Sequence, residues 1–93
     1  MINLYNNLPT IDLHGFDRDY ARIKINEFIL DNCKLKSKTV IIIHGVGTGI
    51  LRKETQKILK ENKYVAEYKI DNFNVGQTIV KLIDNIDKKP WLC

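Results

Sequence analysis

Hydrophobic and polar positions follow two different periods along this chain, and these periods predict strands and helices in turn. Residues 10–14 alternate polar and apolar side chains, which predicts a short strand. Residues 39–43 are β-branched throughout and apolar from Val40, as is typical of a strand buried on both faces. Residues 64–70 alternate again, and after a turn over residues 71–76 a last strand is predicted over residues 78–83.

Two segments between these strands have the spacing of amphipathic helices. Apolar residues recur every three or four positions in residues 18–34, where Asp17 is a candidate N-cap, and again in residues 50–61. The element order is therefore β-α-β-α-β-β. Two right-handed crossovers that progress in the same direction leave both helices on one face of the sheet. The predicted fold is a two-layer α/β sandwich with a four-stranded mixed sheet, in which the last strand runs antiparallel to the others.

The chain of 93 residues suits one domain, which we place at residues 10–83 between an N-terminal lead-in (1–9) and a C-terminal tail (84–93). Its composition, 44% apolar and 28% charged, is typical of a soluble protein with an ordered core. The longest apolar run, residues 40–43, is too short to span a membrane, and no signal-peptide pattern is present. We therefore expect a cytoplasmic protein without a membrane partner.

The net charge of +4 is concentrated in the middle of the chain. Residues 34–63 carry 8 basic and 2 acidic side chains, whereas residues 1–33 carry 3 basic and 5 acidic ones. A basic region of this kind suits a polyanionic partner such as RNA or DNA. The alternative is a solvated, lysine-rich helix face that binds nothing.

Both histidines of the chain stand at predicted strand ends, and each is followed by glycine. His14 ends the first strand, and His44 opens the loop His44-Gly45-Val46-Gly47-Thr48-Gly49 after the second. In the predicted topology these segments and residues 72–78 meet at one edge of the sheet, where open α/β sheets bind ligands. Neighbouring strands lie about 4.8 Å apart, so both imidazoles can reach one phosphodiester.

Strand alternation places Asp12 and His14 on one face of the first strand, opposite the apolar side chains that meet the helices. If His44 shares this open face, Val40 and Ile42 do so as well. These two apolar side chains then need a cover, either from the lead-in, from the tail or from a partner molecule.

The glycine loop and the helix start that follows it form a candidate phosphate-binding site. Glycines let a ligand approach the backbone closely, and the free amides of a helix N-terminus favour an anion. The spacing Gly-x-Gly-x-Gly matches neither the P-loop nor the dinucleotide-binding motif, and a tight turn that requires glycine is the alternative. The candidate phosphate-binding residues are Gly45, Gly47, Thr48, Gly49, Arg52, Lys53, Gly76 and Thr78.

The candidate catalytic residues are Asp12, His14 and His44. Near pH 7 one imidazole can act on the attacking hydroxyl or water and the other on the leaving oxygen, while the carboxylate orients an imidazole. The same three side chains can instead supply three ligands to a divalent metal ion. Because no fourth ligand stands at a supporting spacing, we predict no cofactor.

Three segments resemble the motifs of the Smr (small MutS-related) domain family. Residues 11–15, Ile-Asp-Leu-His-Gly, are similar to its Leu-Asp-Leu-His-Gly motif, and residues 44–49 to its His-Gly-x-Gly-x-Gly motif. Residues 76–80 resemble the Gly-x-Thr-x-Val of its final strand, so the resemblance covers residues 10–83. Of the three glycines in the family's Gly-Gly-x-Gly-x-Thr pattern, the stretch from Phe73 to Thr78 keeps only the last, Gly76, which predicts a bulkier and stiffer loop.

The resemblance implies a fold similar to the C-terminal domain of translation initiation factor three, with sheet order 1-2-4-3. It also implies a nuclease, because Smr domains include DNA-nicking and RNA-cleaving endonucleases. The family's motif residues carry over to Asp12 and His14 and to His44, Gly45, Gly47 and Gly49.

We therefore predict an endonuclease that cleaves phosphodiester bonds in RNA or in DNA, with RNA the favoured partner. The resemblance links this activity to ribosome rescue, with the ribosome as a further partner, or to DNA repair and recombination. The alternatives are a non-catalytic module that binds RNA, DNA or the ribosome, and a protein that binds a small nucleotide.

Overall fold

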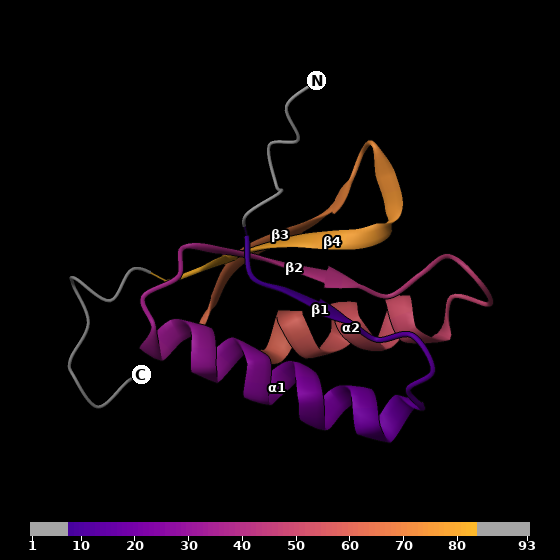
Figure 1. Ribbon diagram of the computed structural model, residues 1–93, viewed down its shortest axis with the longest axis horizontal. Helices are drawn as coiled ribbons and strands as arrows, with labels where there is room; N and C mark the ends of the chain where they lie inside the picture. The colour runs from indigo at the N-terminus through magenta and orange to yellow at the C-terminus, as the bar shows by residue number, and fades with distance from the viewer. Residues whose placement is uncertain (1–7, 84–93) are drawn as a thin grey trace.

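The computed structural model of the protein describes residues 8–83, and its elements follow the predicted order (Figure 1). The strands are β1 (Thr10–Asp12), β2 (Thr39–Ile43), β3 (Val65–Asp71) and β4 (Asn74–Leu82), and the helices are α1 (Arg18–Lys34) and α2 (Ile50–Glu61). Both helices have their predicted bounds. The predicted tail and residues 1–7 of the predicted lead-in lie outside the described residues. No helix within residues 8–83 has the length and apolar character that crossing a membrane requires.

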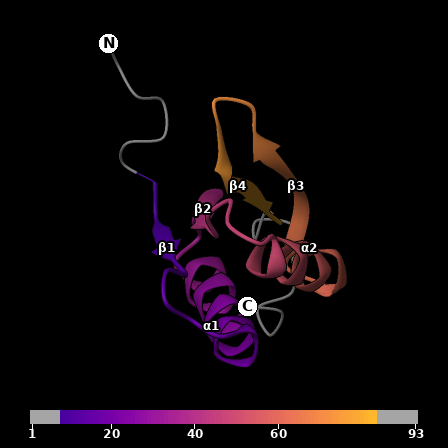
Figure 2. The same ribbon diagram turned by 90° about the vertical axis from the view of Figure 1, so that its right-hand side faces the viewer.

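The four strands form one mixed sheet in the order β1-β2-β4-β3. β1 and β2 are parallel, and β4 runs antiparallel to both of its neighbours, β2 and β3. Figure 2 shows α1 and α2 on the same face of this sheet. Right-handed crossovers explain this placement, because each helix returns the chain to a parallel strand on that side. The predicted two-layer sandwich and its strand order are confirmed.

The hydrophobic core lies between the sheet and the two helices. Its most buried side chains, each at most 1% exposed, are Leu13, Ala21, Ile25, Ile29, Val40, Ile42, Leu59 and Val80. Val40 and Ile42 therefore face the helices, and no further cover is required for them. On the opposite face Ile41 and Ile79 pair across β2 and β4 and are only 2% and 4% exposed. The centre of the sheet is thus apolar on both sides, as the β-branched sequence of β2 predicts.

The hairpin between β3 and β4 differs from the prediction. β4 begins at Asn74 instead of residue 78, and Asp71 pairs with Asn74, so the turn narrows to Asn72 and Phe73. The Asp71 carboxylate accepts hydrogen bonds from the Phe73 N–H (2.8 Å) and from Gln77 Nε2 (2.8 Å). The first of these bonds joins a side chain to the backbone and the second joins two side chains. Neither follows an apolar period, and together they support the hairpin beyond the predicted strands.

The first strand is shorter than predicted. β1 ends at Asp12 instead of His14, although the Leu13 N–H still donates to the Ile43 carbonyl (2.9 Å). The chain then turns at Gly15, whose φ of +80° is readily adopted only by glycine. The polar motif residue His14 therefore lies in the turn that leads to α1.

Replacing a core side chain of β2 should destabilise the protein far more than replacing an exposed one. We expect Ile42→Ala to lower the free energy of unfolding by about 2–5 kcal/mol, and Ile42→Val by about 0.5–1.5 kcal/mol, because a cavity forms beneath the helices. Ile23→Ala, at a side chain 54% exposed, should change it by less than about 0.5 kcal/mol. Urea unfolding measures all three; equal losses at residues 42 and 23 would contradict the assigned core.

Candidate functional site

Hydrogen bonds between backbone groups connect the three motif segments (residues 11–15, 44–49 and 76–80) at the carboxyl edge of β1 and β2. The Leu13 N–H donates to the Ile43 carbonyl at 2.9 Å, which continues the β1–β2 pairing past the end of β1. The Gly76 carbonyl accepts from the N–H groups of both His44 (2.9 Å) and Gly45 (2.8 Å). The structure brings residues 14–15, 44–49 and 76–78 to one sheet edge, as predicted, whereas Asn72 and Phe73, which were predicted to join them, form the tip of the β3–β4 hairpin.

His44 lies on the side of the sheet that faces the helices, and its ring is 7% exposed with both nitrogens engaged. Nε2 lies 2.8 Å from Thr78 Oγ1, and Nδ1 lies 2.9 Å from the Gly45 carbonyl oxygen. A carbonyl can only accept, so in the neutral ring Nδ1 donates to Gly45 and Nε2 accepts from the Thr78 hydroxyl. The imidazole thus links the glycine loop to β4.

Asp12 and His14 lie at the end of β1, and both are exposed. Asp12 pairs with Ile43 in the sheet, so it projects on the face opposite the buried Leu13. Its Oδ1 accepts a hydrogen bond from the His14 backbone N–H at 2.9 Å, which shapes the turn. The structure therefore brings the three candidate catalytic residues to one edge but points Asp12 and His44 to opposite faces of the sheet.

A cleft of about 440 Å³ lies on the helix side of this edge, between the starts of the two helices. The glycine loop and the start of α2 supply one wall, and the start of α1 supplies the other. Its lining residues are Phe16, Asp17, Arg18, His44, Gly47, Thr48, Gly49, Ile50 and Leu51. The free backbone N–H groups of two helix N-termini therefore lie beside one opening, an arrangement that favours an anion.

Two glycines are required by their surroundings. Gly49 is the N-cap of α2 with a φ of +84°, and a Cβ there would lie 3.3 Å from Arg52 Nη2. A Cβ on Gly76 would lie 3.2 Å from Asn74 Oδ1 and 3.5 Å from the Gly45 Cα. A side chain at position 49 would press on the Arg52 guanidinium, and one at position 76 would press on the Asn74 amide.

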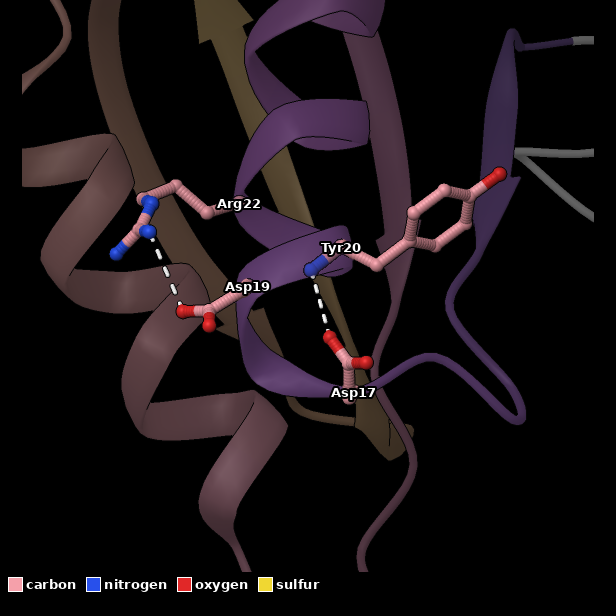
Figure 3. Close-up of polar contacts among 4 residues, drawn as sticks. All are labelled: Asp17, Asp19, Tyr20 and Arg22. Carbon is pink, nitrogen blue, oxygen red and sulfur yellow. Dashed lines mark hydrogen bonds and ion pairs between the residues drawn. The ribbon is translucent and has the colours of Figure 1, made fainter.

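Positive charge at the edge comes from Arg18, Arg52 and Lys53. In residues 8–83 no carboxylate forms an ion pair with any of them. Figure 3 shows the start of α1: Asp17 accepts from the Tyr20 N–H (2.8 Å), and Asp19 pairs with Arg22 (3.2 Å). Neither carboxylate forms an ion pair with Arg18, so its guanidinium has no carboxylate partner within the described residues.

Five residues that line the cleft are not among the predicted site residues: Phe16, Asp17, Arg18, Ile50 and Leu51. α1 follows the β1 motif after a short turn, so its first residues must reach the same sheet edge as the start of α2. Their position in the topology was the available signal, because Phe16, Asp17 and Arg18 follow the β1 motif directly and Ile50 and Leu51 follow the glycine loop.

The described part of the chain offers no group of three or more His, Cys, Asp or Glu side chains able to hold a metal ion. The alternative in which Asp12, His14 and His44 act together as ligands is therefore not realised in this arrangement. The physical reason is that the buried ring of His44 is bonded to Thr78 and Gly45 on the helix side, whereas Asp12 projects on the open face.

Removing the Thr78 hydroxyl should leave the buried His44 Nε2 without a partner. We expect Thr78→Val to lower the free energy of unfolding by about 1–3 kcal/mol, and NMR should show a changed Nε2 resonance. Thr78→Ser keeps the hydroxyl, so its Nε2 resonance should stay close to that of the unmodified protein, although it loses a buried methyl worth about 0.8 kcal/mol. An Nε2 resonance that is the same in all three proteins would contradict the assigned bond.

Comparison with known proteins identifies the family. The family model described as the Smr domain matches residues 11–83. Relatives include proteins named Endonuclease MutS2 from Clostridium acetobutylicum, 34% identical over 83 residues (89% of this chain), and from Halothermothrix orenii, 34% identical over 76 residues (82%). The chain spans about a tenth of the length of each of them, since the matched part is 10% of either protein.

Two solved structures have the same fold. The Smr domain of Thermus thermophilus MutS2 superposes with a TM-score of 0.79 at 25% identity, covering 82% of this chain and 99% of that one. YdaL, a stand-alone small MutS-related protein from Escherichia coli, superposes with a TM-score of 0.75 at 23% identity, covering 78% of this chain and 63% of that one. With the motifs fastened at one sheet edge, these matches show that the chain belongs to the Smr domain family.

Proposed function

We propose that this protein binds nucleic acid at the carboxyl edge of its sheet and cleaves phosphodiester bonds there as an endonuclease. The observation that supports this most is the pair of bonds from His44 and Gly45 to the Gly76 carbonyl, which hold the glycine loop beside β4 and the β1 motif. The name Endonuclease MutS2, carried by relatives of which this chain matches one domain, supports the same activity. A cytoplasmic location remains part of this proposal.

In this proposal the glycine loop and the start of α2 bind the phosphate. Amide groups of residues 46–49 and the hydroxyl of Thr48 donate hydrogen bonds to phosphate oxygens, Gly45 provides close backbone approach, and Arg52 and Lys53 add positive charge. The exposed position of Thr48 and the absence of described ion pairs at both basic residues support this role. Thr78 and Gly76 act from behind the loop, because they hold His44 and Gly45 in place.

Asp12 and His14 are the proposed proton-transfer groups. Both are exposed on the same strand end, so a bound strand can reach them. His44, whose two ring nitrogens are bonded within the chain, takes part in proton transfer only if one of these bonds opens when substrate binds. Its proposed contribution in the free protein is to orient the loop that binds the phosphate.

RNA is the favoured substrate in this proposal because it carries its own nucleophile. A base removes the proton of the 2′-hydroxyl as its oxygen attacks phosphorus, and an acid gives a proton to the departing 5′-oxygen. The products are a 2′,3′-cyclic phosphate and a 5′-hydroxyl end. DNA lacks the 2′-hydroxyl, so its cleavage requires an activated water instead.

A non-catalytic module that binds RNA, DNA or the ribosome is the second candidate function. The engagement of both His44 ring nitrogens favours it, because a binding module needs a well-ordered loop but no mobile proton carrier. Incubating the pure protein with labelled RNA and DNA, with and without chelator, separates the two functions. Tight, salt-sensitive binding with intact substrate in every arm would select the module.

Changing the β1 motif should abolish cutting while binding is largely kept. We expect Asp12→Asn and His14→Ala each to slow cleavage of labelled RNA by about 10²–10⁴-fold, the usual contribution of a general acid or base. Asparagine keeps an oxygen that can accept from the His14 N–H, so the turn should persist. Asp31→Asn, an exposed carboxylate near the far end of α1, is the matched control. Full activity in a protein with both motif changes would eliminate this assignment.

Removing a phosphate contact should reduce the salt dependence of binding. For Arg52→Ala we expect the slope of log affinity against log salt to decrease by about 0.7 with single strands and 0.9 with duplex. Lys34→Ala, in the last turn of α1 at the opposite edge of the molecule, should leave the slope unchanged. Equal decreases for the two variants would show that binding is spread over the surface rather than centred on the loop.

A further inference from the structure

The tip of the β3–β4 hairpin carries the most exposed large hydrophobic side chain in the described part of the chain. Phe73 is 98% exposed at this tip. Figures 1 and 2 show the tip projecting away from the two helices, on the side of the sheet's open face. Burying an aromatic side chain removes about 150–250 Å² from water, so a ring presented at a hairpin tip can add substantial affinity for a partner that covers it.

The tip is held in place by hydrogen bonds and is tied to the glycine loop. The Asp71 carboxylate, in a residue 4% exposed, accepts from the Phe73 N–H on one side and from Gln77 Nε2 on the other, both at 2.8 Å. Asn74 Oδ1 accepts from the Gly76 N–H at 3.0 Å. Since the Gly76 carbonyl binds His44 and Gly45, the hairpin and the loop form one ordered unit.

Exposed apolar side chains gather in this unit. The described residues include seven exposed large hydrophobic side chains, and four of them belong to the loop, the start of α2 or the hairpin: Val46 (56%), Ile50 (56%), Phe73 (98%) and Val75 (54%). The same edge carries the unpaired charges of Arg18, Arg52 and Lys53. Apolar side chains beside free positive charge suit a ligand that presents both flat apolar faces and phosphates, as an unpaired nucleic-acid strand does.

We propose that Phe73 stacks on an unpaired base of the nucleic acid whose phosphate lies at the glycine loop, so that the protein selects single-stranded substrates. This inference rests on the proposed function. The ring is presented at the tip of a projecting hairpin, where an unstacked base can lie against its face. In a duplex each base is already stacked on its neighbours and paired, so the same ring finds no base face to cover. The side chain therefore adds affinity for unpaired nucleotides only.

A protein partner that covers the hairpin tip is the competing explanation for the exposed phenylalanine. The unpaired positive charges of the same edge favour the nucleic acid, because its phosphates can neutralise these charges while one of its bases covers the ring. Binding to isolated oligonucleotides decides between the two, since no protein partner is present in that assay.

The first experiment compares binding of a 12-nucleotide single strand and a duplex of the same sequence to matched variants. We expect Phe73→Ala to weaken single-strand binding by about 5- to 150-fold, the range for losing one base–aromatic stack, and to leave duplex binding unchanged. Phe73→Trp should keep or improve single-strand affinity. Leu35→Ala, at a side chain 75% exposed beyond the last turn of α1, should change neither. Equal losses on both substrates, or no loss on either, would overturn the proposal.

The second experiment detects the stack itself. In a protein whose only natural tryptophan, Trp91, is replaced by phenylalanine, Phe73→Trp supplies an indole at the hairpin tip and Leu35→Trp supplies one elsewhere. Oligothymidylate should quench the emission of the first and leave that of the second unchanged. Unquenched emission from residue 73 in the saturated complex would contradict stacking.

The two proposals fail in different ways. If intact protein never cuts RNA but Phe73→Ala still weakens single-strand binding selectively, the endonuclease proposal fails and base stacking stands. If cutting requires Asp12 and His14 while Phe73→Ala binds both substrates like the unmodified protein, base stacking fails and the endonuclease proposal stands.

Discussion

The carbonyl of Gly76 is the constraint on which the candidate site depends. It accepts hydrogen bonds from two successive N–H groups, those of His44 and Gly45, and so holds the loop after β2 against the start of β4. The two backbones are in van der Waals contact here, since a Cβ on Gly76 would lie 3.5 Å from the Gly45 Cα. The hydrogen bond between the His44 imidazole and the Thr78 hydroxyl is a second link between the loop and β4. The glycine loop is therefore ordered before any ligand arrives, which lowers the entropic cost of binding one.

This constraint divides the edge of the sheet into two regions. On the helix side, the buried His44 and the starts of α1 and α2 surround a cleft that Arg18 also lines. On the open side lie Asp12 and the projecting hairpin with Phe73. In the proposed function, a nucleic-acid strand that crosses the edge would meet the proposed phosphate-binding loop on one side and the ring of Phe73 on the other. The exposed His14, in the turn from β1 to α1, lies at the same edge.

The spacing of apolar residues predicted the helices and strands well, because each element must bury the apolar side chains of one face. The bounds of α1 and α2 and the parallel pairing of β1 with β2 follow from apolar spacing and crossover handedness alone. The hairpin was predicted less well. Its extension to Asn74 depends on hydrogen bonds of Asp71 with Phe73 and Gln77, and polar contacts of this kind leave no hydrophobic period.

By itself the sequence determined the family, the topology and the edge at which the motifs meet, because motif spacing and the handedness of crossovers allow few other arrangements. Only the tertiary structure decided which way the motif side chains face. His44 follows a strand whose even-numbered residues pack against the helices, so its ring enters the helix side and bonds to Thr78, whereas Asp12 projects on the open face. Strand alternation tells which residues of one strand share a face. Which residues of two neighbouring strands share a face depends on their register, and the register is set by the assembled sheet.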